Sequence, residues 1–264
     1  MLHTIMLGTR GRDTMELETI CNIGMSKYKM AKQDPIRFFV RSIVAGLYLG
    51  IATILSYIIG SMLLGVNEIV SKIAYAGTFG IGLVCIILLG AELFTGNCFT
   101  TIIPVYAKRI KLVQIMPMWI ICYIGNFIGI FLLSFLFIKS GAQNGFIKPY
   151  LASMYESKIV YDALGLFIKG ILCNFIVCVA AYSGIKCKSE TAKIILVFVL
   201  VMTFVLSGFD HSIANMGTFS LIFTQFGTSL SWGFLPMHML LSTLGNIIGG
   251  SILLGVPIYL MIKE

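Results

Sequence analysis

The stretch GFDHSIAN at residues 208–215 decides the fold, because GAELFTGN at residues 90–97 repeats its pattern 118 positions earlier. Both stretches fit the pattern Gly-x-acid-x-x-x-small-Asn. Two further pairs share this spacing: GNFIG at 125–129 with GNIIG at 245–249, and GLYLG at 46–50 with GLFIKG at 165–170. Three matches at an offset of 118 to 120 residues predict an internal repeat.

The composition places this repeat in a membrane. Of the 264 residues, 58% are hydrophobic and only 11% are charged, whereas a soluble domain carries about 25% charged residues. Long stretches without Lys, Arg, Asp or Glu are sufficient to cross a hydrocarbon core about 30 Å thick as helices. The six spans are expected at about 38–64, 73–105, 112–139, 161–184, 192–225 and 234–262.

The second and fifth spans are too long to be ordinary membrane helices. A helix of about 33 residues would extend about 50 Å. Each of these spans also holds one copy of the polar repeat near its middle, which favours an interruption there. Since each repeat has three spans, an odd number, the two halves insert in opposite orientations.

The expected fold is therefore all-α and integral to the membrane, with six transmembrane helices arranged as two inverted three-helix repeats. The repeats cover about residues 36–140 and 161–262, and helices 2 and 5 are interrupted. Residues 1–35 form a separate polar segment without the apolar core of a signal peptide, so we expect this segment to be cytoplasmic.

Lysine and arginine are distributed unevenly along the chain, which has a net charge of +8. If the spans alternate, fourteen basic residues fall on the side of the N-terminus: Arg10, Arg12, Lys27, Lys29, Lys32, Arg37, Arg41, Lys108, Arg109, Lys111, Lys186, Lys188, Lys193 and Lys263. Four fall on the other side: Lys72, Lys139, Lys148 and Lys158. This positive-inside bias predicts that both termini are cytoplasmic, and it accounts for the basicity without a nucleic-acid partner. The seven scattered cysteines predict no metal site, and nothing indicates a cofactor.

The two interruptions are expected to line a pathway, because unwound backbone inside a membrane needs protein or water around it. Half-helices that begin there direct positive dipole ends at the pathway, which favours an anion. His211 lies inside the second interruption, where its imidazole can exchange a proton near neutral pH or donate a hydrogen bond. Thr95 and Asn174 are candidate donors beside it. Lys158 and Lys169 are candidates to draw anions from the outer side, although Lys158 could also be an ordinary loop charge.

Four polar residues recur at equivalent places in the two interruptions. Glu92 and Asp210 are ionisable groups where charge is costly. We expect them to point away from the pathway and to accept backbone N–H bonds across the interruptions. Asn97 and Asn215 are expected to cap or brace the half-helices, with ordinary helix packing as the alternative.

Large apolar residues on either side of the interruptions are candidates for constrictions in the pathway. From the sequence alone, packing in the core or against lipid is the favoured interpretation of each. They are Phe79, Leu83, Leu93, Phe94, Val177 and Phe204.

The runs AELFTGN at 91–97, GILCNFIVC at 170–178 and SGFDHSIANM at 207–216 resemble the signature motifs of the formate/nitrite transporter family. The resemblance covers about residues 25–262 and implies an aquaporin-like protomer in a homo-pentamer, with a pore for a small monovalent anion in each protomer. By motif position it implies a central site at Thr95, Asn174 and His211, and Lys158 in the outer vestibule. It also implies an outer constriction of Leu93, Phe94 and Val177, and an inner one of Phe79, Leu83 and Phe204.

Departures from the family pattern bear on the substrate. Asp210 stands where Glu is commoner, and Gly96-Asn97 stand where formate channels more often have Ser-Thr. The chain most resembles the hydrosulfide-conducting branch, so hydrosulfide is the favoured substrate, with formate and nitrite open. The expected setting is the lipid bilayer of a bacterial inner membrane.

Two other functions fit the sequence less well. An aquaporin-like pore for a neutral solute is disfavoured because neither interruption contains Asn-Pro-Ala. An intramembrane hydrolase could use Asp210, His211 and Ser212. Consecutive residues on a helix point about 100° apart, however, so they cannot form a catalytic triad. We therefore expect no enzymatic activity.

Overall fold

The computed structural model describes residues 2–142 and 144–263, and every regular element in that part of the chain is a helix. The first half contains α1 (Leu2–Gln33), α2 (Pro35–Leu64), α3 (Glu68–Phe79), α4 (Ile81–Leu89), α5 (Phe94–Thr100), α6 (Ile102–Tyr106) and α7 (Leu112–Lys139). The second half contains α8 (Asn144–Ile159), α9 (Ala163–Lys186), α10 (Glu190–Leu206), α11 (Ser212–Phe226), the 3-10 turn η1 (Gly227–Ser229), α12 (Leu235–Ile248), the π-helix η2 (Gly249–Leu254) and α13 (Gly255–Ile262).

Five helical segments of the described chain are long and apolar enough to cross a membrane: Pro35–Leu64, Glu68–Leu89, Leu112–Lys139, Ala163–Lys186 and Leu235–Ile262. The stretch expected as the fifth span contains α10 and α11, which have 17 and 15 residues. These two helices meet at the interruption around His211.

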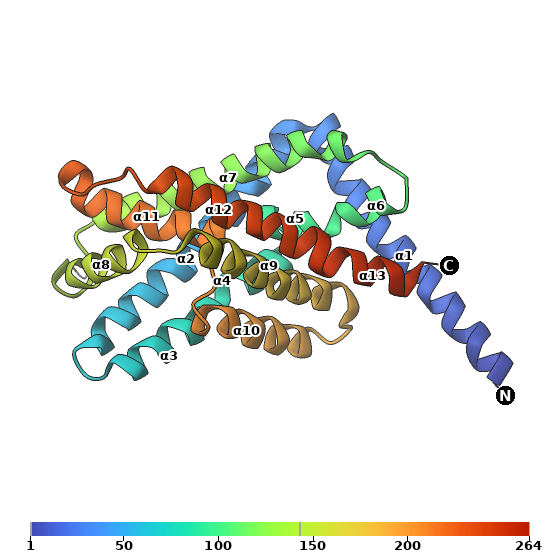
Figure 1. Cartoon of the computed structure of the whole chain (residues 1–264), viewed down its shortest axis with the longest axis horizontal. Coiled ribbons are helices and arrows are strands. Elements are labelled where there is room, and N and C mark those ends of the chain that lie inside the picture. Colours follow the sequence, from blue (N-terminus) through green and yellow to red (C-terminus); the bar gives the residue numbers. More distant parts are fainter. Residues whose placement is uncertain (1, 143, 264) are drawn as a thin grey trace.

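The helices pair in the same way in the two halves: α2 packs along α7, and α9 packs along α12 (Figure 1). Glycines allow the close crossing in both pairs. A Cβ on Gly129 would lie 2.0 Å from the carbonyl oxygen of Ile43, and one on Gly249 would lie 2.1 Å from that of Ile171. Any larger residue would push the paired backbones apart.

Both interruptions begin with a glycine in the left-handed region. Gly90 (φ 73°) follows α4 and Gly208 (φ 69°) follows α10, and a side chain at either position would be strained. Extended residues then lead into α5 at Phe94 and into α11 at Ser212. The two interruptions therefore have equivalent geometry.

Hydrogen bonds set the register of the repeat. Asn126 Nδ2 donates to the carbonyl of Ser42, and Asn246 Nδ2 donates to that of Gly170, each at 2.8 Å. These carbonyls are 128 positions apart (170 minus 42). The match of residues 46–50 with 165–170 at an offset of 119 was therefore in the wrong register. The stretch from this carbonyl to the carboxylate of the interruption is 50 positions long in the first repeat (42 to 92) and 40 in the second (170 to 210), a difference that a constant offset cannot represent.

The segment 1–35 contains a helix, α1, whose last part packs against α2, α5, α6 and α13. Both chain ends lie at the same end of the molecule (Figure 1). Two acidic side chains of α1 make polar contacts with later parts of the chain. Glu16 contacts Tyr182 and Lys186, and Glu18 accepts hydrogen bonds from Arg109, one of them at 3.0 Å. The N-terminal segment is thus docked on the ends of the membrane helices.

Candidate functional site

Three cavities follow one another through the middle of the protein. We call the first the Lys158 cavity; it has a volume of about 410 Å³ and also contains Asp210 and His211. We call the last the Lys27 cavity; it has a volume of about 250 Å³ and also contains Glu92. Each shares lining residues with a small central cavity of about 10 Å³, which is about the space of one water molecule.

The central cavity is enclosed by apolar side chains and one imidazole, and we call these residues the central collar. They are Leu49, Phe79, Leu83, Leu93, Val177, Val201, Phe204 and His211. The collar separates two polar cavities, so an ion that passes between them loses nearly all of its water.

His211 is fixed at both ring nitrogens. The backbone N–H of Ala214 donates to Nδ1 at 3.0 Å, so that the imidazole caps the first turn of α11. Nε2 lies 2.9 Å from the hydroxyl of Thr95, on the opposite half-helix. Phe204 stacks on the ring with the planes 23° apart. The structure therefore joins the two interruptions through a Thr95–His211 hydrogen bond.

These contacts determine the tautomer. Nδ1 accepts a hydrogen bond from a backbone donor, so the proton of the neutral ring is on Nε2. Nε2–H then donates to Thr95 Oγ1, and the hydroxyl proton of Thr95 is available to another acceptor. A second proton on the ring would break the cap on Ala214.

The constriction residues are not arranged in the order that the resemblance implied. Phe79 and Phe204 also line the Lys158 cavity, whereas Leu93 also lines the Lys27 cavity. Leu83, which the resemblance placed with Phe79 and Phe204, lines the Lys27 cavity together with Leu93. The cavities therefore divide the collar differently from the two sets that the resemblance implied, and motif position alone carries no direction along the pore.

Phe94 is the one proposed constriction residue outside the central collar. Its ring packs edge-to-face against Tyr123 and Trp119, with centroids 5.0 Å and 6.4 Å away. It lines a separate apolar cavity between α7 and α12. Successive residues at the start of a half-helix face different sides, so Leu93 reaches the collar and Phe94 does not.

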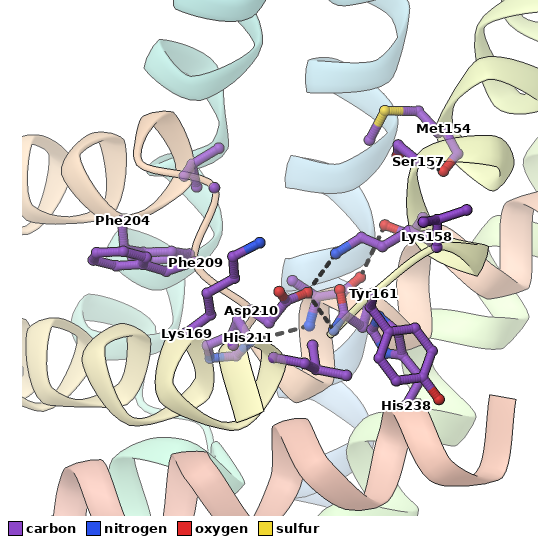
Figure 2. A pocket seen from close by; sticks show the side chains of 18 of the residues that line it. Met154, Ser157, Lys158, Tyr161, Lys169, Phe204, Phe209, Asp210, His211 and His238 are labelled. Carbon is purple, nitrogen blue, oxygen red and sulfur yellow. Dashed lines mark hydrogen bonds and ion pairs between the residues drawn. The ribbon is translucent and has the colours of Figure 1, made fainter. Parts of the chain in front are cut away.

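Each interruption carries a carboxylate, an asparagine and a lysine from another helix. Asp210 contacts Lys158 and accepts a hydrogen bond from Asn215 Nδ2 at 3.1 Å (Figure 2). Lys27 of α1 donates to Glu92 at 2.8 Å and to the Asn97 side-chain oxygen at 2.7 Å. The polar group around Asp210 and the polar group around Glu92 are therefore equivalent in the two halves, and they lie on opposite sides of the central collar.

The carboxylates do not point away from the pathway as expected. Glu92 lines the Lys27 cavity and Asp210 lines the Lys158 cavity. Their charge is compensated by the ammonium groups of Lys27 and Lys158 and not by backbone N–H groups, and the Arg41 guanidinium also lies 3.8 Å from Glu92. Lys27 was missed because it lies 65 positions before Glu92, in a segment treated as separate.

Two other asparagines support the interruptions. Asn126 accepts from the Phe94 N–H at 2.9 Å and donates to the Glu92 carbonyl at 2.8 Å. Asn246 accepts from the Ser212 N–H at 2.8 Å and donates to the Asp210 carbonyl at 2.9 Å. Asn126 and Asn246 each follow a glycine in the repeated segments 125–129 and 245–249. This repetition was the sequence signal that could have identified them as supports of the interruptions.

Asn174 and Lys169 lie in different surroundings. Asn174 is fully buried and donates to the Asn246 carbonyl at 2.6 Å and to the Thr95 carbonyl at 3.2 Å. It borders none of the three cavities in the described structure, so it positions Thr95 through the backbone. Lys169 lines the Lys158 cavity.

Comparison with known proteins agrees with this geometry. The family model described as formate/nitrite transporter matches residues 14–260, nearly the whole chain. The chain belongs to the formate/nitrite transporter family. Its membership agrees with the all-helical architecture and makes it a multi-pass membrane protein, and the relatives are transporters and channels, not enzymes.

Several relatives and structures resemble the chain over most of its length. An uncharacterized transporter of Bacillus subtilis, YwcJ, is 31% identical over 92% of this chain and 96% of its own. The nitrite transporter NirC of Escherichia coli is 31% identical over 86% of this chain and 84% of its own. A solved ion channel of the same family superposes with a TM-score of 0.87 at 28% identity, covering 95% of this chain and 100% of the other. A pentameric formate channel with formate bound superposes with a TM-score of 0.76 at 24% identity, covering 89% and 100%.

Proposed function

We propose that this protein is a channel for small monovalent weak-acid anions, with hydrosulfide favoured and formate and nitrite as the other candidates. Each protomer of a homo-pentamer would contain its own pore, in a bacterial inner membrane with both chain ends cytoplasmic. Family membership supports the transport of small anions, since relatives are named as a nitrite transporter and a formate channel. The pentamer is supported by the formate channel of the same fold, which is described as pentameric.

The charged groups on the two sides of the collar suit an anion pathway. Lysines in a concave site raise the local concentration of anions. Lys158 and Lys27 are each paired with a carboxylate, which limits how tightly an anion is held. Conduction needs binding that favours arrival without preventing departure.

The Thr95–His211 pair carries the proposal, because His211 is the polar residue of the otherwise apolar collar and Thr95 is its hydrogen-bond partner. A bare ion is costly in such surroundings. A weak-acid anion can shed its charge by taking a proton from water in the cavity, whereas chloride cannot. His211 lines the collar, so its Nε2–H can turn from Thr95 to the species in transit and donate a hydrogen bond to it. Because Ala214 occupies Nδ1, His211 holds the substrate and does not supply the proton.

A flux panel tests the substrate. Purified protein in liposomes is given equal inward gradients of hydrosulfide, formate or nitrite, and the initial uptake rate is compared with that of protein-free vesicles. The proposal expects all three to exceed the vesicle background, with hydrosulfide the fastest. Faster formate or nitrite would reassign the preferred substrate, and no flux of any of them would overturn the function.

A further inference from the structure

A second buried histidine lies in the wall of the Lys158 cavity and has no role in the pathway described above. His238, in the first turn of α12, is only 1% exposed and is one of the residues that line this cavity. Its Nδ1 is buried and has no hydrogen-bond partner among the residues that the structure describes. Buried polar atoms are nearly always paired in folded proteins, so this one requires an explanation.

Packing does not require a histidine at this position. The ring makes edge-to-face contacts with Tyr161 and Phe219, both with centroids 5.3 Å away, and with Phe234 at 6.2 Å. A phenylalanine has nearly the same shape and would leave no unpaired polar atom among these rings. A residue that is unfavourable for local stability often serves function.

The charges of this cavity leave one cation without a partner. Lys158 is paired with Asp210, and Asp162 caps α9 by accepting from the Gly165 N–H at 2.6 Å. Lys169 makes no ion pair within residues 2–142 and 144–263. Figure 2 shows the side chains of Lys158, Lys169 and His238 around Asp210.

We propose that His238 and Lys169 form a binding site for the transported anion in the Lys158 cavity, before the anion reaches the central collar. This inference rests on the proposed function. The ligand is a small monovalent anion, which accepts a hydrogen bond from the His238 ring and is attracted by the Lys169 ammonium group. Binding gives the imidazole the partner that it lacks, and it concentrates the anion next to His211.

Concentration-dependent uptake tests the site. The initial rate of formate uptake is measured in liposomes over a range of formate concentrations, for the wild type and for His238→Phe. Phe keeps the ring packing and removes both nitrogens. We expect the half-saturating concentration to rise by about tenfold, the effect of losing one charge-assisted hydrogen bond. The maximal rate should stay within about twofold, because the collar is intact.

Two further measurements distinguish this site from a merely structural role. The thermal unfolding midpoint of His238→Phe should not fall below that of the wild type, since an unpaired buried polar atom is removed. Lys169→Met should raise the half-saturating concentration in the same direction. Tyr155→Phe removes a hydroxyl from a side chain that does not line the Lys158 cavity, and it should leave that concentration unchanged.

The outcomes separate the two proposals. If the wild type passes no anion, the proposed function fails. If the wild type conducts and His238→Phe saturates at the same formate concentration, the binding site is wrong. A change in the maximal rate alone would also overturn it. Should His238→Phe not elute as the wild type does in size-exclusion chromatography, His238→Leu carries the same test.

Discussion

At the scale of single residues, the imidazole of His211 performs two tasks, capping α11 and contacting Thr95. His211→Asn should separate them, because Asn is a good N-cap residue but is too short to replace the contact with Thr95. We expect anion flux to fall by about tenfold or more, from loss of about 1.4 kcal/mol or more of stabilisation in the collar, while the pentamer stays folded. His211→Phe should lose flux and also about 1 kcal/mol of stability with its cap. Liposome flux and thermal unfolding measure the two effects, and unchanged flux in both variants would reduce His211 to a packing residue.

Asn126 and Asn246 should contribute to stability more than any surface polar residue. Each bonds one N–H and two carbonyls around an interruption. Replacing either by Ala leaves buried backbone groups unpaired. This lowers the free energy of unfolding by about 1–3 kcal/mol for each group that water does not reach. The thermal midpoint of the solubilised protein should fall clearly for both variants and stay constant for Lys188→Ala, an exposed control. Equal midpoints for all three would contradict this role.

At the scale of helices, the packing of α9 against α12 and the π-helix η2 that continues it depends on Gly249, the first residue of η2. An added Cβ would lie 2.1 Å from a backbone oxygen, which cannot move without moving α9. Gly249→Ala should therefore lower the yield of folded protein and its thermal midpoint. Gly77→Ala is the matched control, because nothing lies within 4 Å of its Cβ position, and a helical Ala is favoured over Gly by about 0.5–1 kcal/mol. If Gly249→Ala unfolds at the wild-type temperature, the close crossing is not needed.

The docking of α1 should depend on pH through Glu18. The hydrogen bond from Arg109 lowers the pKa of the Glu18 carboxyl below its ordinary value of 4.5. A lowered pKa in the docked state means that the ion pair contributes fully above pH 4.5 and is lost as the pH falls through the docked-state pKa. The protection of residues 13–33 from hydrogen exchange, measured relative to the intrinsic exchange rate at each pH, should thus fall in acid, and this fall should shrink in Glu18→Gln. Equal protection at pH 7 and at pH 4 would rule out this contact.

Long charge-free stretches and the repeated motifs were enough to predict the long apolar helices, because both are local properties of the chain, but they did not predict α1 or α8. The interruptions at 90–97 and 208–215 were located by a glycine and an acid inside an overlong span, and both glycines have positive φ. The support of the interruptions was not predictable in this way. Lys27 and Asn126 reach Glu92 from 65 and 34 positions away, and no local pattern specifies such pairs.

At the scale of the whole molecule, two polar cavities are joined by one nearly closed apolar collar. Sequence indicated most of the collar residues, but not which of them faces which cavity. Leu93 lines the Lys27 cavity and Phe204 lines the Lys158 cavity, an order that depends on how the two halves assemble. The pairing of each carboxylate with a lysine likewise requires the assembled fold, since α1 and α8 supply the cations.

Under the proposed function, the collar passes weak-acid anions and excludes an anion that cannot be protonated. The most direct test compares the initial flux of hydrosulfide with that of chloride in the same proteoliposomes at the same gradient. The account predicts that hydrosulfide exceeds the protein-free background by about tenfold or more, because a neutral species avoids the cost of a bare ion in the collar. Chloride should stay at background. Equal rates for the two anions, or no hydrosulfide flux, would contradict the account.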